Sequence, residues 1–293
     1  MSEPFFSVLL PTKNRSIIVD DAIRSVLQQT FPDWELIISD NDDSPTATRE
    51  VVAGFTDPRI HYFRTSGRLP MHDNWESAFN HSQGRHVLIL EDKQRLNSTA
   101  LETLHRILGT QPEAVITYPV VLTSQESLPP IPPTLEPVRI TSIELLNRYC
   151  DFDEDSWQFL PRGLNSCAPS VLLRQLQATS PTGQVFSHLA PDHSQAYQLL
   201  SRVDSILHVP GDVIYIPTSL RKKGTFSNGL SCIRKDENAR RWFSELPVPL
   251  EDLVRDVPIK THWMPLNVIL HDFRRFLHRA DYAPNLNLSL IHI

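Results

Sequence analysis

Short apolar runs alternate with amphipathic segments through the N-terminal part of the chain, and this alternation constrains the fold more than any other feature of the sequence. Strand-like runs cover residues 5–12, 34–41, 59–64, 86–90 and 113–121. Helical patterns fall between them, at residues 20–30, 46–55, 73–84 and 98–108. Strands that alternate with helices at this spacing form right-handed βαβ units. We therefore expect an α/β fold with a mostly parallel sheet flanked by helices.

Local signals predict where these helices begin and end. Asp20 and Asp21 are expected in the first turn of the first helix, where carboxylates favour the helix dipole. Asp73 is expected as the N-cap of the third helix and Ser98 as the N-cap of the fourth. Gly84 has the residue type preferred just after a helix, so it is expected at the C′ position of the third.

Three of the predicted strands end in polar residues. These ends are residues 11–15 (PTKNR), 39–44 (SDNDDS) and 91–95 (EDKQR). The carboxyl ends of parallel strands meet at one edge of the sheet, which is where ligands bind in such folds. We therefore expect the three segments to gather there. A lysine directly beside the acidic pair of the third segment is the unusual feature of this edge.

The second half of the sequence is richer in helices. Residues 124–137 carry too many prolines for a regular element and are expected to form a surface linker. The predicted elements that follow are helices at residues 142–149 and 169–177, a polar segment leading into a helix within 186–202, and a strand at 205–216. Two or three amphipathic helices are predicted from 237–246 through 266–279. The expected domains are residues 1–123, 124–232 and a helical appendage at 233–287. Residues 288–293 resemble a translated sequencing adapter and are expected to be a non-native tail, with a short natural apolar tail as the alternative.

Composition excludes several functional classes. The net charge of −6 disfavours non-specific nucleic-acid binding. The nine glycines form neither the dinucleotide-binding nor the P-loop pattern. The three cysteines are scattered without metal-type spacing, which favours a reducing compartment. No signal peptide and no apolar run near the roughly 20 residues of a membrane helix is recognised, so a cytoplasmic location is expected.

Four motifs occur in an order and spacing that resemble a known family. They lie in residues 6–15 (FSVLLPTKNR), 22–44, which end in IISDNDDS, and 73–96, which contain DNW and LILEDKQRL. Together they resemble the nucleotide-sugar-binding half of family 2 glycosyltransferases of the GT-A fold. The resemblance is close from residue 5 to about 120 and looser to about 230. It implies a Rossmann-like sheet that binds a nucleotide-diphosphate sugar.

The resemblance also implies which residues contact the donor. In the family the loop after the first strand lies against the nucleotide, the aspartate that ends the second strand accepts a hydrogen bond from the base, and polar residues at the head of the third helix lie near the sugar. The implied donor-binding residues are Pro11, Thr12, Asn14, Arg15, Asp40, Asn41, Asp42, Asn74, Asp92 and Lys93. The sequence alone leaves an alternative open, because DNDDSP is also a strong turn sequence and its aspartates could serve the turn only.

The family's acidic triplet, which holds a divalent metal against the diphosphate, falls on Asp92, Lys93 and Gln94. Only the first position of the triplet, Asp92, is acidic in this sequence. Glu91, one position before the triplet, is the candidate for the second ligand. Oxygen ligands would suit Mn²⁺ or Mg²⁺. Two roles for Lys93 remain open: its ammonium replaces metal charge at the diphosphate, or it merely pairs with a neighbouring carboxylate.

The resemblance places the catalytic base at Asp192, at the head of a helix that follows a G-x-x-F loop, here residues 183–186. A carboxylate there would take the proton of the acceptor hydroxyl during inverting transfer. The simpler alternative is that Asp192 is a helix N-cap. His193 is expected to be structural, and residues 221–229 are either a loop that closes over the diphosphate or a solvated loop.

We therefore predict an inverting glycosyltransferase that uses a nucleotide-diphosphate sugar and a hydroxyl acceptor on a glycan, lipid or protein. One alternative is a catalytically impaired relative that still binds nucleotide sugars. Another is a peripheral membrane enzyme with lipid-linked acceptors, since residues 271–279 (HDFRRFLHR) mix basic and apolar side chains. A sugar-nucleotide pyrophosphorylase is disfavoured because its Gly-rich basic signature is absent.

Overall fold

A computed structural model describes residues 3–151, 153–187, 189–221, 249 and 265–277. Within these residues the largest feature is an eight-stranded sheet of order β3-β2-β1-β4-β9-β6-β10-β8. Its strands are β1 (Phe6–Thr12), β2 (Trp34–Asp40), β3 (Ile60–Arg64), β4 (His86–Ile89), β6 (Ile116–Thr117), β8 (Val138–Thr141), β9 (Ser166–Pro169) and β10 (Ser205–His208). The pairing makes β8 and β9 antiparallel to the rest. The predicted mostly parallel sheet is confirmed.

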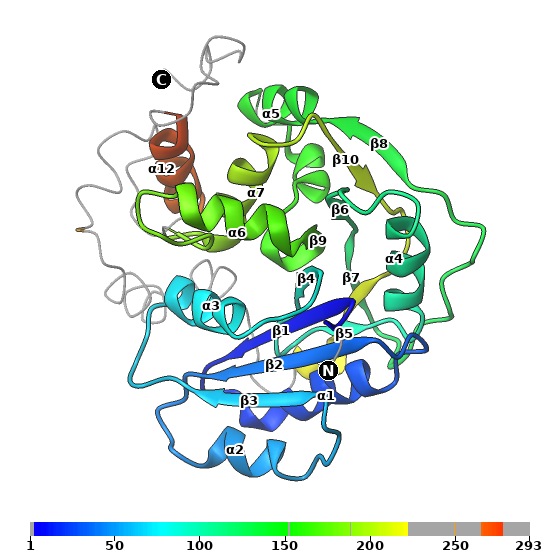
Figure 1. The fold of residues 1–293 in the computed structure, drawn as a ribbon, viewed down its shortest axis with the longest axis vertical. Helices are drawn as coiled ribbons and strands as arrows, with labels where there is room; N and C mark the ends of the chain where they lie inside the picture. The colour runs from blue at the N-terminus through cyan, green and yellow to red at the C-terminus, as the bar shows by residue number, and fades with distance from the viewer. Residues whose placement is uncertain (1–2, 152, 188, 222–248, 250–264, 278–293) are drawn as a thin grey trace.

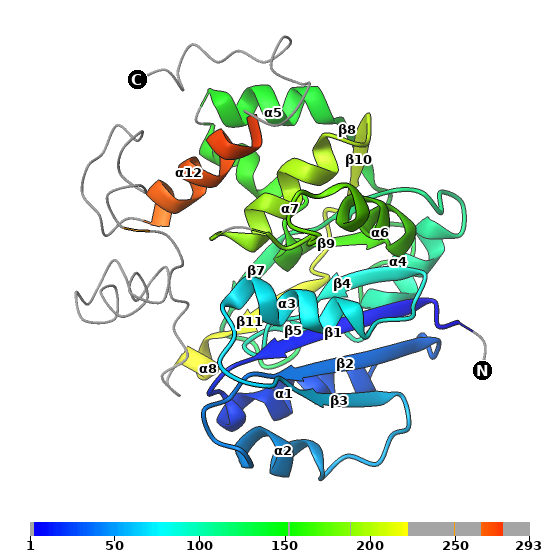
Figure 2. The ribbon, with the colours of Figure 1, turned by 60° about the vertical axis from the view of Figure 1, so that its left-hand side comes forward.

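Helices cover both faces of this sheet (Figures 1 and 2). One face carries α1 (Ser16–Leu27), α2 (Ala47–Val52) and α4 (Ala100–Leu108). The other carries α3 (Met71–Asn80), α5 (Ser142–Cys150), α6 (Ser170–Thr179), α7 (Pro191–Leu200) and α12 (Pro265–Leu277). The strands are apolar on both sides, as a doubly covered sheet requires. Val8 and Leu10 of β1 pack toward the first layer, and Leu9 packs toward the second.

A small second sheet stands beside the large one, in the order β5 (Arg95–Leu96), β11 (Ile214–Pro217), β7 (Val120–Thr123). The predicted single strands at 113–121 and 205–216 were therefore wrong in extent, because each is split between the two sheets. Pro119 and Pro210 lie at the breaks, where a residue without an N–H group interrupts a ladder. The first part of each segment lies in the large sheet, where β6 pairs with β10. The second part lies in the small sheet, where β7 pairs with β11.

Two of the predicted helix starts were wrong. Helix α1 begins at Ser16, directly after the PTKNR loop, and its first turn contains no acidic residue. Asp20 instead accepts a hydrogen bond from Arg24 at 2.9 Å, one turn further on. Helix α3 begins two residues before Asp73, with Pro70 at the N-cap, and Asp73 accepts a hydrogen bond from Gln184 at 2.7 Å.

The ends around β4 also differ from expectation. The N-cap of α4 is Thr99, not Ser98, and its N–H donates to the side chain of Asn97 at 3.2 Å. Helix α3 ends with His81 at the C-cap, so Gly84 does not cap it. A Cβ at Gly84 would lie 2.6 Å from the backbone nitrogen of Ser7, so the close approach of this turn to β1 requires glycine.

Residues 124–137 contain no helix or strand, as predicted, although Ile131 is buried in the core. The short strand β8 that follows was not predicted. The remaining described elements are the 3-10 helices η1 (Glu154–Phe159) and η2 (Gly163–Asn165) and the short helix α8 (Thr218–Arg221). No helix in the described ranges is long and apolar enough to cross a membrane. The predicted helix at 237–246, the loop beyond residue 221, Cys232 and the tail at 288–293 lie outside the described residues.

Candidate functional site

The ends of β1 and β4 are joined by side chains, as the parallel topology predicts. Thr12, the last residue of β1, donates a hydrogen bond from Oγ1 to Oδ2 of Asp92 at 3.0 Å. Arg15 donates from Nη1 to the other oxygen, Oδ1, at 3.2 Å. Asp92, the first residue of the predicted acidic triplet, is therefore held by the end of β1 and by the loop that follows it. That loop is predicted to lie against the nucleotide.

Asp92 is nearly buried, and its protonation is set mainly by that burial. Its exposed fraction is 6%. Burial raises the pKa of Asp92 from 3.8 to about 6, and the Glu91 carboxylate acts in the same direction. Arg15, the hydrogen bond from Thr12 and the Lys93 ammonium act in the opposite direction without cancelling the effect of burial. Asp92 can therefore exchange a proton close to neutral pH.

This raised pKa predicts how Asp92 affects stability. Between about pH 4 and pH 6 the folded protein keeps the proton that the unfolded chain has released, so the wild type loses stability as the pH rises. Asp92→Asn has no such proton. We therefore compare the free energy of unfolding of the variant with that of the wild type at two pH values. We expect the difference, variant minus wild type, to be about 2 kcal/mol larger at about pH 7.5 than at about pH 4.5. Urea unfolding at the two pH values measures this change, and a constant difference would contradict it.

The acidic pair and the lysine form one compact turn. Lys93 donates from Nζ to Glu91 Oε1 at 2.9 Å, although the lysine is only 8% exposed. Gln94 closes the turn, because its side-chain oxygen accepts from the Glu91 N–H at 2.9 Å. The predicted pairing of Lys93 with a neighbouring carboxylate is thus present. It does not exclude a phosphate partner, because a lysine ammonium has three N–H donors.

The carboxylates of Asp92 and Glu91 are the predicted metal ligands. Among the described residues no group of three or more His, Cys, Asp or Glu side chains is arranged to hold a metal ion. Mg²⁺ is often bound through one or two carboxylates, with phosphate and water supplying the other ligands. The pair fits a cation that arrives with a diphosphate, and it does not fit a metal held by protein ligands alone.

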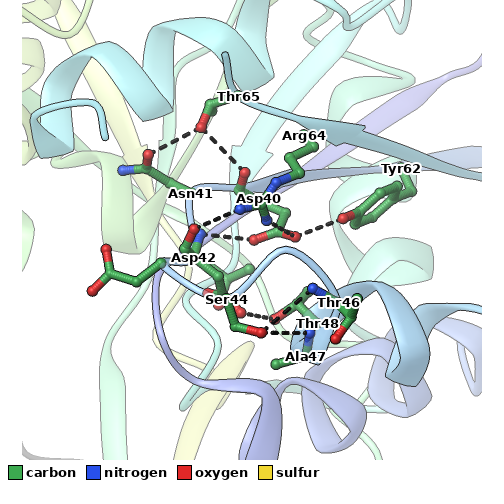
Figure 3. Close-up of polar contacts among 12 residues, drawn as sticks. Asp40, Asn41, Asp42, Ser44, Thr46, Ala47, Thr48, Tyr62, Arg64 and Thr65 are labelled. Carbon is green, nitrogen blue, oxygen red and sulfur yellow. Dashed lines mark hydrogen bonds and ion pairs between the residues drawn. The ribbon is translucent and has the colours of Figure 1, made fainter. Parts of the chain in front are cut away.

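Asp40, predicted to contact the base, is enclosed by its own neighbours (Figure 3). Its exposed fraction is 0%. Oδ2 accepts hydrogen bonds from Tyr62 Oη at 2.6 Å and Arg64 Nη1 at 3.0 Å, and Oδ1 accepts from the Asp42 N–H at 2.8 Å. Because none of the Asp40 surface is exposed, a base N–H could reach this carboxylate only after the neighbouring side chains moved. The contacts favour the turn-forming alternative, and the base contact stays a prediction.

Asn41 and Asp42 also organise the loops at this edge. Asn41 accepts a hydrogen bond from the Leu69 N–H at 2.9 Å and donates to the Leu69 carbonyl at 2.8 Å, which ties the loop after β3 to the end of β2. Asp42 accepts from the Thr48 hydroxyl at 2.7 Å, as drawn in Figure 3, and from the backbone N–H of Asn14. Neither side chain has more than 5% of its surface exposed.

The loop after β1 turns at Asn14, whose φ of 58° lies in the left-handed region. Asparagine tolerates this conformation better than most residues because its side chain can bond locally. Here the side chain donates to Asp43 at 3.0 Å and accepts from the Asp43 N–H at 2.8 Å. The turn redirects the chain from Thr12 at the end of β1 into Arg15 and α1. Through the contacts with Asp43, the loops after β1 and β2 form one connected rim.

Asn74 lies beneath this rim. It accepts a hydrogen bond from the Ser39 hydroxyl at 2.7 Å and donates to the Thr12 carbonyl at 3.4 Å. Asn74 is 4% exposed, so in this structure it positions the ends of β1 and β2. The predicted contact with the sugar stays a prediction.

Glu76, one turn along α3, is a functional residue that the sequence analysis missed. Its Oε2 accepts hydrogen bonds from the backbone N–H groups of Val185 and Phe186, both at 3.0 Å, and Gln177 donates to its Oε1 at 2.6 Å. Burial raises the pKa of Glu76. The sequence feature that could have identified Glu76 as a buried residue is its position beside Trp75, on the apolar side of a helix. Glu76 fixes the G-x-x-F loop that leads into α7.

Asp192 lies in the first turn of α7, after Pro191. The N-cap of α7 is Ala190, so the N-cap alternative for Asp192 was wrong. Its side chain is 16% exposed, and its Oδ2 lies 3.8 Å from Nε2 of His193. Burial lowers the pKa of His193 to about 4, so the imidazole is neutral at pH 7 and forms no ion pair with Asp192. The Asp192 side chain is therefore a partly exposed carboxylate in the first turn of a helix.

Helix α12 completes the support of α7, which the sequence analysis did not foresee. Asp272, 1% exposed, accepts a hydrogen bond at 2.7 Å from the N–H of Ala190, the α7 N-cap. Phe273 packs against Tyr197 of α7 with ring centroids 4.8 Å apart. The apolar side of α12 therefore packs against α7 in the interior of the protein.

Sequence comparisons place these features in a family context. The family model described as glycosyl transferase family 2 matches residues 7–175, which is more than half of the 293 residues. The GalNAc(5)-diNAcBac-PP-undecaprenol beta-1,3-glucosyltransferase of Campylobacter jejuni is 36% identical over 104 residues, 34% of this chain and 33% of that protein. The UDP-Glc:alpha-D-GlcNAc-diphosphoundecaprenol beta-1,3-glucosyltransferase WfgD of Escherichia coli is 31% identical over 91 residues, 31% of this chain and 36% of that protein. Each match spans about a third of the relative's length.

A structural comparison extends the likeness beyond these alignments. The crystal structure of S. aureus TarS in complex with UDP-GlcNAc matches with a TM-score of 0.57 and 12% sequence identity, over 94% of this chain and 73% of that one. At this identity the match shows a shared fold. The expected GT-A arrangement of sheet and helices is confirmed.

Proposed function

This chain belongs to glycosyl transferase family 2, and from that membership we propose that it transfers a sugar from a nucleotide-diphosphate donor to a hydroxyl acceptor with inversion. One observation supports the proposal above the others: α3 connects the two halves of the site. Asn74 contacts the end of β1, where the donor is expected, and Glu76 holds the loop before the proposed base, Asp192. A shared rigid support is what a two-substrate displacement requires.

The donor diphosphate is proposed to bind where β1 and β4 end. Arg15 and Lys93 place two cations at this edge, each beside a carboxylate. A diphosphate would draw on both cations, since hydrogen bonds between ammonium or guanidinium groups and phosphate oxygens are strong. A divalent metal bound with the diphosphate at Asp92 and Glu91 would add positive charge at the same place.

The proposed reaction is a direct displacement at the anomeric carbon. The acceptor oxygen attacks and forms the new glycosidic bond, while its proton passes to the Asp192 carboxylate. The bond from the anomeric carbon to the phosphate oxygen breaks, and the nucleotide diphosphate leaves with the electron pair. Lys93 and Arg15 stabilise the negative charge that develops on the leaving group.

For the acceptor and the location we propose a glycan or lipid-linked hydroxyl in the cytoplasm. Both curated relatives described above are named for undecaprenol-linked acceptors, which supports a lipid-linked acceptor. Cys150 and Cys167 are free, buried thiols, as is typical of a reducing compartment. Peripheral membrane contact remains part of the proposal, with liposome co-sedimentation as its test.

A binding protein without transferase activity is the second candidate. The ion pairs that engage Asp92 and Glu91, the two candidate metal ligands, favour it. A screen of nucleotide sugars by isothermal titration, followed by donor hydrolysis with and without Mn²⁺, separates the two. The transferase proposal predicts that at least one donor both binds and is hydrolysed. Binding without hydrolysis or transfer would favour the second candidate, and no binding would contradict both.

A further inference from the structure

Buried polar atoms without a hydrogen-bond partner are concentrated near the proposed base. Three of those in the described ranges lie between η1 and the end of η2, namely Trp157 Nε1, Arg162 Nε and Asn165 Oδ1, and a fourth is Gln195 Oε1 of α7. More than nine in ten buried polar groups in proteins are satisfied by protein or water. The four atoms in this loop and the helix it packs against are two donors, Trp157 Nε1 and Arg162 Nε, and two acceptors, so both kinds of hydrogen-bonding capacity remain unused there.

This loop is fixed against both halves of the site. A Cβ on Gly163 would lie 2.7 Å from the Trp75 ring of α3, 2.9 Å from Gln195 Oε1 of α7 and 3.2 Å from the side chain of Ile89, the last residue of β4. Only glycine permits so close a packing of three elements. The residue before it, Arg162, is therefore held at the junction of α3, α7 and the β4 edge.

Among the described residues, no ion pair neutralises the charge of Arg162. In the described part of the chain no carboxylate lies within ion-pair distance of its guanidinium, and its Nε has no hydrogen-bond partner. It lies close enough to His193 to contribute, after burial, to the lowered pKa of that imidazole. Arginine keeps its charge at any physiological pH and presents a planar set of donors that matches phosphate and carboxylate groups. Arg162 thus offers a binding position for an oxyanion beside Asp192.

The direction of the displacement indicates which substrate carries that oxyanion. In an inverting reaction the base and the leaving group lie on opposite faces of the sugar ring. Arg15 and Lys93, the cations on the leaving-group side, belong to the β1 and β4 ends. Arg162 lies instead with the residues around the base, which is the side from which the acceptor approaches.

We propose that Arg162 binds an oxyanion of the acceptor, a phosphate or carboxylate close to the reacting hydroxyl, and that the enzyme thereby selects an anionic acceptor. This proposal rests on the proposed function, because it needs Asp192 to act as the base. Arg162 would orient the acceptor through its charge and its fork of donors, and the side-chain oxygens of Gln195 and Asn165 would accept hydrogen bonds from hydroxyl groups of the same substrate.

Titration of the UDP-saturated protein tests the proposal. UDP binding is measured first; excess UDP then occupies the diphosphate position, and inorganic phosphate or glucuronate is titrated into the complex. We expect one probe to bind and Arg162→Gln to weaken it about 10- to 100-fold, the usual effect of losing a hydrogen bond to a charged group. The probe that binds more tightly identifies a phosphate or a carboxylate as the acceptor's group.

Two further variants make the result specific. Arg202→Gln removes an exposed arginine beyond the opposite end of α7 and should leave probe binding unchanged. Arg162→Lys keeps the charge but not the planar fork, so it should retain part of the affinity and serves if Arg162→Gln fails to fold. Failure of both probes to bind, or equal binding by wild type and both Arg162 variants, would overturn the proposal. A parallel loss of UDP affinity in Arg162→Gln would assign this residue to the donor instead, and a wild type that binds no nucleotide diphosphate at all would contradict the proposed function itself.

Discussion

Asp192→Asn is expected to reduce sugar transfer by about 10²- to 10⁴-fold, the range that general-base catalysis contributes. The substitution keeps the shape of the side chain and removes the group that takes the acceptor's proton. Because His193 is neutral at pH 7 and lies 3.8 Å away, Asp192 forms no ion pair with it that the substitution would break. The fold and donor affinity should therefore be retained, and the loss should appear in kcat rather than in the KM for the donor.

The measurement compares transfer rates with the affinity for the donor identified in the nucleotide-sugar screen. Asp204→Asn is the matched control, because it removes an exposed carboxylate just beyond the C-terminal end of α7. It should change neither quantity by more than about twofold, as expected for surface substitutions. An Asp192→Asn protein that transfers sugar at the wild-type rate would contradict the assignment of the base.

The features that were predicted correctly depend on short-range patterns and on one rule of topology. Apolar runs bounded by Pro11 or by the acidic turn after Leu90 predicted the strands that carry the site. Parallel pairing then required the ends of β1 and β4 to meet, and the contact between Thr12 and Asp92 confirms this. The rule needs only strand direction, which alternation with helices determines.

What was missed depends on contacts between residues far apart in the sequence. Glu76 was not among the predicted site residues, but it accepts hydrogen bonds from Val185 and Phe186, more than 100 positions away. Asp272 supports α7 from a segment that was expected to form a separate appendage. A position on the apolar side of a helix, as for Glu76, indicates that a carboxylate is buried, but no local pattern identifies the distant N–H group that it meets.

Some errors arose because two explanations fitted the same residue type. Gly84 satisfied the expectation for a helix end, but the structure requires it for the close approach to Ser7. Asp73 and Ser98 are good capping residues that lie one or more positions away from the caps that formed. Capping preferences are worth only about 1 kcal/mol each, so packing of the surrounding elements decides the final boundary.

Lys93→Ala is the second substitution for which we expect a large loss of activity. It is 8% exposed beside Asp92, and the described residues contain no three-ligand metal cluster. If its ammonium stabilises the leaving diphosphate, Lys93→Ala should lower kcat about 10²- to 10³-fold, as the loss of one preorganised electrostatic group does elsewhere. Transfer by the wild type in excess EDTA should then stay within about twofold of its rate with Mn²⁺.

Glu91→Gln separates this role from metal binding, because Glu91 is both the partner of Lys93 and the second candidate ligand. A glutamine keeps a hydrogen-bond acceptor for the ammonium but lacks the negative charge with which a carboxylate attracts a divalent cation. If Lys93 supplies the charge, Glu91→Gln should transfer sugar at nearly the wild-type rate and Lys93→Arg should recover part of the activity lost in Lys93→Ala. Strict dependence on a divalent metal, with an inactive Glu91→Gln and a fully active Lys93→Ala, would refute the role of Lys93 and assign the charge on the diphosphate to a metal held by Asp92 and Glu91.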